Sequence, residues 1–118
     1  MPYTDFAKNK MLTPLRADMT HLSLHTADPG ATGLNEVTGG DPAYARVAVT
    51  TADLTAISGG AFTLVADIPF NGPASGACTH MGAWHGTDFL GGNALVGDQT
   101  FNAEGNYNLA MATEFNIA

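Results

Sequence analysis

The chain has 118 residues, of which 45% are hydrophobic and 13% are charged, and its formal net charge is −7. The length predicts a single domain over residues 1–118, and the apolar share excludes a disordered chain. The negative charge disfavours nucleic-acid binding, because such a surface repels phosphate groups.

The sequence also lacks the signals of secreted, membrane-spanning and disulfide-bonded proteins. The amino terminus shows no secretory signal, and no apolar run approaches the roughly 18 residues that a membrane-spanning helix needs. The single cysteine, Cys78, cannot form an internal disulfide. We therefore expect a protein that folds in a reducing cytoplasm, with neither a membrane nor nucleic acid among its partners.

The amino-terminal segment predicts a short helix. Thr4 or Asp5 can cap a helix over residues 6–12. Pro14 disfavours helical backbone at Thr13, although it can start a further turn. A helix this short is expected to need packing against the rest of the domain.

Alternating apolar and polar residues predict strands through the rest of the chain. The first covers residues 21–26, with Leu22 and Leu24 on one face, and a loop of turn residues follows at 27–43. Further strands are predicted at about 44–51, 61–70, 77–85, 94–101 and 106–117, with turns at 71–76 and 88–92. This pattern predicts a mainly β fold, an antiparallel β-sandwich or small barrel with a short N-terminal helix.

Two of these strands alternate most cleanly. One face of residues 61–70 carries Phe62, Leu64, Ala66, Ile68 and Phe70. One face of residues 106–117 carries Tyr107, Leu109, Met111, Thr113, Phe115 and Ile117. We expect each face to be the buried side of one half-buried antiparallel strand.

The four histidines form two near pairs in the sequence. His21 and His25 share one face of a strand but lie about 13 Å apart, too far to bind one zinc ion without a bend. His80 and His85 point to opposite faces of a regular strand, because they are five residues apart. We interpret all four as exposed or singly hydrogen-bonded side chains. A zinc site assembled across strands stays open as the alternative.

No catalytic motif is present. Cys78 and His80 share a strand face, but no third group marks them as a nucleophile and its base, and a buried cysteine packed beside Trp84 is the commoner arrangement. The chain contains no GxSxG, HExxH, paired CxxC or P-loop sequence. We expect no enzymatic activity, no cofactor and no catalytic metal.

The loop at 27–43 is rich in oxygen ligands. It contains Asp28, Glu36 and Asp41, with Asn35 beside them, and calcium favours such loops. The spacing does not match the EF-hand pattern, so a loop held by ordinary turns is the simpler interpretation. Whether the loop holds an ion is left open by the sequence.

Aromatic side chains offer another possible site. Tyr3, Tyr44, Trp84 and Tyr107 would stack on sugars if they were exposed. Trp84 lies in an apolar strand, and Tyr107 joins the inward face of the last one. We therefore interpret these residues as core packing.

Three blocks of the sequence resemble one family. They are LSLHTADPG at 22–30, GGDPAYARVAV at 39–49 and CTHMGAWHGTDFLGGNAL at 78–95. In this order they resemble small structural proteins of tailed bacteriophages, often labelled tail-fibre or minor virion proteins. The resemblance implies a non-enzymatic virion component, assembled in the host cytoplasm, with no catalytic residues to carry over.

The resemblance also implies partners. The chain lacks a long C-terminal shaft or repeat, so we expect a capsid decoration or minor capsid protein. The alternative is a tail-associated module or one that binds a carbohydrate receptor. The expected partners are major capsid or tail proteins and further copies of the chain, because virion proteins repeat symmetrically.

The amino-terminal arm, about residues 1–18, is the predicted docking element. We expect it to become ordered on binding, so that deletion of residues 1–16 removes attachment and leaves the β domain folded. Three of the chain's four basic residues lie in these first 16 positions. The candidate docking residues are Tyr3, Phe6, Lys8, Lys10 and Arg16.

Overall fold

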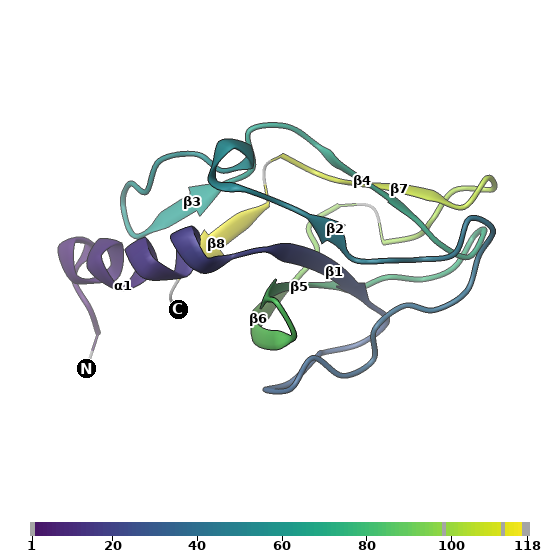
Figure 1. Cartoon of the computed structure of the whole chain (residues 1–118), viewed down its shortest axis with the longest axis horizontal. Helices are drawn as coiled ribbons and strands as arrows, with labels where there is room; N and C mark the ends of the chain where they lie inside the picture. Colours follow the sequence, from purple (N-terminus) through teal and green to yellow (C-terminus); the bar gives the residue numbers. More distant parts are fainter. Residues whose placement is uncertain (1, 98, 112, 117–118) are drawn as a thin grey trace.

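The computed structural model describes residues 2–97, 99–111 and 113–116 (Figure 1). Every strand pairing in these ranges is antiparallel. The elements are α1 (Asp5–Asp18), β1 (His21–His25), β2 (Val47–Ala48), η1 (Thr51–Asp53), β3 (Ala61–Thr63), β4 (Ile68–Asn71), β5 (His80–His85), β6 (Asp88–Ala94), β7 (Asn106–Leu109) and β8 (Glu114–Asn116). The predicted mainly β fold with one N-terminal helix is confirmed, and it is an open sandwich rather than a closed barrel.

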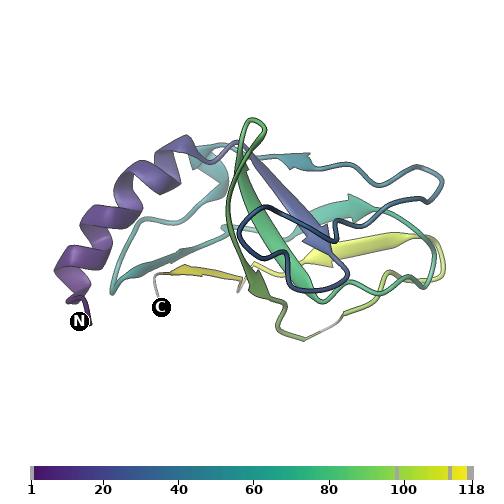
Figure 2. The ribbon, with the colours of Figure 1, turned by 90° about the horizontal axis from the view of Figure 1, so that it is seen from below.

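The main sheet has the strand order β2-β1-β5-β6. Two further pairs, β3–β8 and β4–β7, complete the fold, and α1 lies beside β3 at one end of an elongated molecule of 43 × 26 × 26 Å (Figures 1 and 2). Apolar side chains of all three sheets meet in one core. It includes Leu22, Leu24, Phe62, Phe70, Met81, Leu109 and Phe115.

Helix α1 is longer than predicted. Thr4 caps it as expected, because its hydroxyl accepts a hydrogen bond from the amide of Ala7 at 3.2 Å. The expected end near residue 12 is wrong, since the helix continues through Pro14 to Asp18. Proline removes one helical hydrogen bond, but packing of the fully buried Leu12 offsets this loss.

Two predicted strands are each divided in the structure. The 61–70 stretch forms β3 and β4, which pair with β8 and β7 respectively. Its alternating residues are buried as predicted except Ala66, which lies exposed in the bend. Hydrogen bonds hold this bend, from the amide of Val65 to the carbonyl of Asp53 and from the amide of Met111 to the carboxylate of Asp67.

The 106–117 stretch likewise forms two strands, β7 and β8. Tyr107, Leu109 and Phe115 are buried as predicted, whereas Met111 is exposed between the strands. Ile117 lies outside the described residues. Alternation therefore identified buried positions correctly but did not reveal where each strand bends.

The predicted turn at 88–92 is wrong. These residues belong to β6, the edge strand of the main sheet, and the reversal lies at Gly86 and Thr87. Glycines in β6 suggested a turn, but Gly92 serves close packing: a Cβ there would lie 2.8 Å from Pro29. Among its described residues, the predicted strand at 94–101 forms an isolated bridge at Thr100 beyond the end of β6. The predicted strand at 44–51 is shorter in the structure, where β2 covers Val47–Ala48 and Thr51 begins η1.

Candidate functional site

The three sequence blocks meet on one face of the main sheet. Leu22 and Leu24 of β1 face the main core, so Ser23 and His25 point to the other side. Trp84 of β5 lies on this second face, since its indole nitrogen donates to Ser23 at 2.8 Å. The loop between β1 and β2 covers all three side chains, which are buried.

A chain of hydrogen bonds connects Trp84, Ser23 and His25. The indole N–H of Trp84 donates to Ser23 Oγ at 2.8 Å. The carbonyl of Leu34 can only accept, so His25 Nδ1 carries a proton in the 2.7 Å bond between them. In the neutral imidazole, Nε2 then accepts the hydroxyl proton of Ser23 at 2.7 Å, and the ring fastens the loop to β1.

A second group of side chains continues this network. Arg46 forms a bidentate pair with Glu36, with Nη2–Oε1 at 2.9 Å and Nε–Oε2 at 3.0 Å. Tyr44 donates its hydroxyl proton to Glu36 at 2.8 Å and accepts the amide of Leu24 at 2.9 Å. The guanidinium carbon of Arg46 lies 3.5 Å from the ring centroid of Trp84, a stacked cation–π contact.

We call these six side chains the buried network. Three of them, Ser23, His25 and Trp84, are buried, and the other three, Glu36, Tyr44 and Arg46, are half-buried. Two glycines allow its close packing, because a Cβ at Gly82 would lie 2.6 Å from Ser23 Oγ, and one at Gly33 would lie 2.6 Å from the indole ring. The family-like motifs thus supply the residues that hold the loop onto the sheet.

The electrostatics follow from burial and pairing. Burial lowers the pKa of His25 below 6.5, against the opposing effects of the Leu34 carbonyl and Glu36. Burial alone would raise the pKa of Glu36, but hydrogen bonds from Arg46 and Tyr44 outweigh it and lower the pKa below 4.5. Burial raises the pKa of the Tyr44 hydroxyl, and the bond to Glu36 raises the pKa of Arg46. At neutral pH the network therefore holds one neutral histidine and one ion pair.

We predict that the network makes the fold acid-sensitive. Below pH 6.5 the unfolded chain binds a proton at His25 that the folded chain resists, so the free energy of unfolding should fall as the pH drops through this range. The contribution of Glu36 should be lost only below pH 4.5, as its lowered folded-state pKa is reached. Urea unfolding at a series of pH values measures both.

The variant His25→Gln isolates the histidine. Its stability should change less than that of the parent protein just below pH 6.5. Equal slopes in the parent protein and His25→Gln would show that His25 is not the responsible group.

The Ser23–His25 pair has the spacing of a nucleophile and its base, but it is closed to substrates. Both residues are fully buried, and Ser23 already accepts the indole proton of Trp84. In the described ranges, every buried side-chain nitrogen and oxygen has a hydrogen-bond partner. The arrangement is suited to holding a loop, not to a reaction.

Ser23 was not predicted as the partner of His25. The pair considered from the sequence was Cys78 and His80. In the structure Cys78 lies in the core, and His80 forms a hydrogen bond with the hydroxyl of Thr79. The spacing of two between Ser23 and His25 was the available signal. The interpretation of His25 as exposed or singly bonded is wrong, because it is buried with a bond at each nitrogen.

The loop carboxylates are not gathered into one ion site. Asp28 accepts the amide of Gly30 in a turn, whereas Glu36 pairs with Arg46. Within residues 2–97, 99–111 and 113–116, no group of three or more His, Cys, Asp or Glu side chains is placed to hold a metal ion. No helix in these ranges is long and apolar enough to cross a membrane.

The predicted docking residues divide between two faces of α1. Tyr3 and Phe6 are 46% and 71% exposed, and the ammonium of Lys10 lies 5.1 Å from the ring centroid of Phe6. Lys8 and Arg16 lie on the inner side. The stem of Lys8 packs on the hairpin before β3, where a Cβ on the glycine at position 60 would meet its Cδ at 2.9 Å.

Arg16 is used within the fold. Its guanidinium donates to the carbonyls of Leu54 at 2.9 Å and Thr55 at 2.8 Å. Together with the burial of Leu12, these bonds make α1 an ordered part of the domain, not an arm that waits for a partner. Phe6 and Lys10 on the outer face of α1, and Tyr3 just before the helix, are exposed, and their docking role stays a prediction.

Three of the four aromatic residues considered for sugar stacking lie largely inside the molecule. Trp84 and Tyr107 are buried and Tyr44 is half-buried, as the core-packing interpretation predicted. Of the four aromatic residues considered for sugar stacking, Tyr3 has the exposure that such a role requires.

Comparison with known proteins identifies one family. A family model described as "Podophage GP4 fiber I protein gp80" matches residues 6–108, most of the chain and all three sequence blocks. No curated protein and no solved structure matches the chain.

Proposed function

The chain belongs to the family of the podophage GP4 fiber I protein gp80, and from this premise we propose that it is a fibre module on the tail of a phage particle. It is a phage structural protein of the virion. The family match is the observation that carries the proposal. It favours the tail-associated alternative over the capsid decoration or minor capsid role that we expected first from the absence of a shaft.

A rigid domain with one adhesive face fits such a module. The buried network fastens the loop between β1 and β2 to the sheet, so this face of the domain is fixed. We assign attachment to the outer face of α1 and the residues just before it. There the exposed rings of Phe6 and Tyr3 lie near the ammonium of Lys10. Aromatic residues are the side chains that most often dominate binding at protein interfaces.

We propose that this role involves no catalysis. Ser23 and His25, which have the spacing of a nucleophile and its base, are both buried beneath the loop. The partners of the module are then other tail proteins or further copies of the chain. Neither a cofactor nor a metal enters the proposed role.

We predict that Phe6→Asp removes the protein from purified particles. A charge on the outer face should lower the copies per particle at least about tenfold, because an aromatic hot spot contributes more than 1.4 kcal/mol to binding. Quantitative mass spectrometry of particles measures this. Leu34→Asp, which alters a side chain of similar exposure in the loop, is the matched control and should leave the copy number unchanged.

Point variants test docking better than deletion of residues 1–16. Such a deletion would remove the buried Leu12 and the bonds of Arg16, and would therefore destabilise the domain itself. Circular dichroism should show Phe6→Asp to be folded like the parent. Particles that retain a folded Phe6→Asp protein at the parental copy number would show that the outer face of α1 is not the attachment surface.

A further inference from the structure

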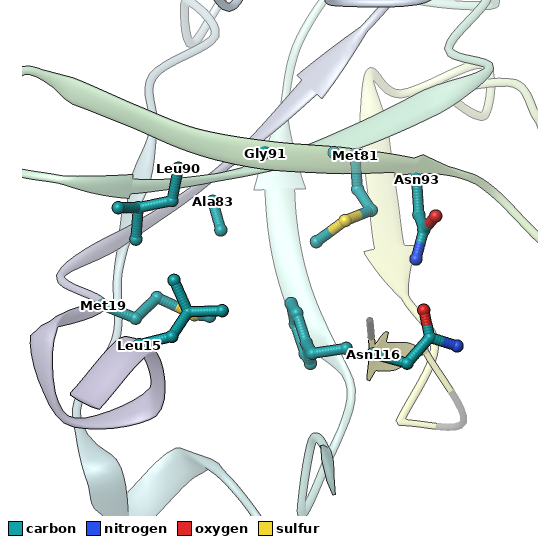
Figure 3. A pocket seen from close by; sticks show the side chains of 10 residues that line it. Leu15, Met19, Met81, Ala83, Leu90, Gly91, Asn93 and Asn116 are labelled. Atoms are coloured by element: carbon teal, nitrogen blue, oxygen red, sulfur yellow. The ribbon is translucent and has the colours of Figure 1, made fainter. Parts of the chain in front are cut away.

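An apolar cleft opens between the last turn of α1, the main sheet and β8 (Figure 3). Its volume is about 230 Å³. Among the residues that the structure describes, its lining is made of apolar side chains, two glycines and two asparagines. The apolar members are Leu15, Met19, Met81, Ala83, Leu90 and Phe115.

The size of the cleft suits one aromatic ring. Pockets for drug-sized ligands measure roughly 300–1,000 Å³, whereas a dry cavity of about 150 Å³ holds benzene. The volume of the cleft lies between these limits, and part of its lining comes from β6, the edge strand of the main sheet. On one side Asn93 and Asn116 point toward each other (Figure 3).

One carboxylate lies beside this apolar opening. Glu114 lines a neighbouring hollow together with the two asparagines, and its side chain is exposed. An aromatic ring accompanied by a cation would therefore complement the cleft.

The outer face of α1 has this complementary chemistry. Phe6 is the most exposed aromatic side chain, and the ammonium of Lys10 lies 5.1 Å from its ring. Three of the four basic residues lie in the first 16 positions, where Asp5 is the single acidic residue, and the other ten acidic residues follow. The first 16 positions are therefore basic, whereas the rest of the chain is acidic.

Phe6 cannot reach the cleft of its own chain. It precedes Leu15 by nine residues, which places the two side chains about 13 Å apart along the axis and on opposite faces of α1. We propose that the cleft receives Phe6 of a second copy of this chain, with Lys10 against Glu114. This inference rests on the proposed function, because it names a partner for the same outer face.

The contact joins two different surfaces and is therefore heterologous. Each copy contributes one Phe6 and one cleft, so repetition closes into a ring or continues as an open chain. Either form multiplies the module along or around a fibre. Copies that lack one of the two surfaces should end the assembly.

Complementary variants test this arrangement by sedimentation-equilibrium centrifugation of the full chain. Phe6→Asp removes the ring, and Asn93→Arg obstructs the cleft from an exposed position that spares the core. The parent should assemble with rising concentration, and each variant alone should associate at least about tenfold more weakly. An equimolar mixture should form a 1:1 dimer, since one intact ring and one intact cleft remain.

Met111→Asp is the control for surface charge, because Met111 is an exposed apolar residue outside the cleft, and it should assemble like the parent. A parent protein that stays monomeric up to about 1 mM, or a mixture that forms no dimer, overturns the inference. Monomeric protein that still attaches to particles through Phe6 would overturn it and leave the proposed function standing. Self-association without particle attachment would support the inference and contradict the proposed function.

Discussion

Trp84→Ala is expected to lower the free energy of unfolding by about 3–5 kcal/mol, the usual cost of emptying a large buried aromatic site. The indole contacts Phe89 with ring centroids 4.9 Å apart, supports the guanidinium of Arg46 and donates to Ser23. A domain of this size has a net stability of about 5–15 kcal/mol, so the variant should lose a substantial share of it.

Urea unfolding followed by circular dichroism measures the loss, since Trp84 is the only tryptophan and its fluorescence disappears with it. Trp84→Phe is the matched control. It keeps most of the ring but leaves Ser23 without the indole donor, so it should cost about 1–3 kcal/mol. A loss below about 1 kcal/mol in Trp84→Ala would contradict the claim that this side chain holds the loop and sheet together.

Gly82→Ala should lower the free energy of unfolding by about 2–4 kcal/mol, through overpacking and a disturbed hydrogen bond. The added methyl would lie 2.6 Å from Ser23 Oγ and 2.7 Å from His25 Nε2, where neither side chain has space to move. Gly30→Ala is the comparison, because a Cβ there meets nothing within 4 Å and only the positive φ of 62° costs about 1–2 kcal/mol.

A double-mutant cycle sharpens this test. With Ser23→Ala in place, the nearest clashing atom is gone, so Gly82→Ala should cost less than it does in the parent protein. Additive costs in the double variant, measured by urea unfolding, would indicate that strain elsewhere causes the loss.

The buried network explains why the sequence blocks identify the family without identifying a surface. Tyr44 and Arg46 are two residues apart because both must reach Glu36, and Gly82 precedes Trp84 because the serine and histidine pack against it. These residues maintain the fold. The surfaces that we assign to binding, the outer face of α1 and the cleft, lie largely outside this network.

Local patterns predicted the buried positions well. The helix cap at Thr4 and the burial of Phe62, Phe70 and Leu109 follow from side-chain chemistry and a period of two. Strand ends were less predictable, because alternation continues across a bend such as that at Ala66. Which strands pair depends on contacts distant in the sequence.

The candidate sites were harder to predict than the strands, because they are formed by residues that are far apart in the sequence. The sequence placed Glu36 among possible ion ligands because its partner, Arg46, lies beyond the glycine-rich loop. The continuation of α1 through Pro14 could likewise not be predicted locally. Arg16 in its last turn donates to the carbonyls of Leu54 and Thr55, which are far away in the sequence. Phe6, predicted as a docking residue, is 71% exposed, and its docking role stays a prediction.

Cryo-electron microscopy of the intact particle tests the central claim most directly. The account predicts density for this elongated domain, with α1 at one end, among the fibres of the tail (Figure 2). Regular copies on the capsid lattice, with none on the tail, would contradict the tail-fibre role and restore the decoration role.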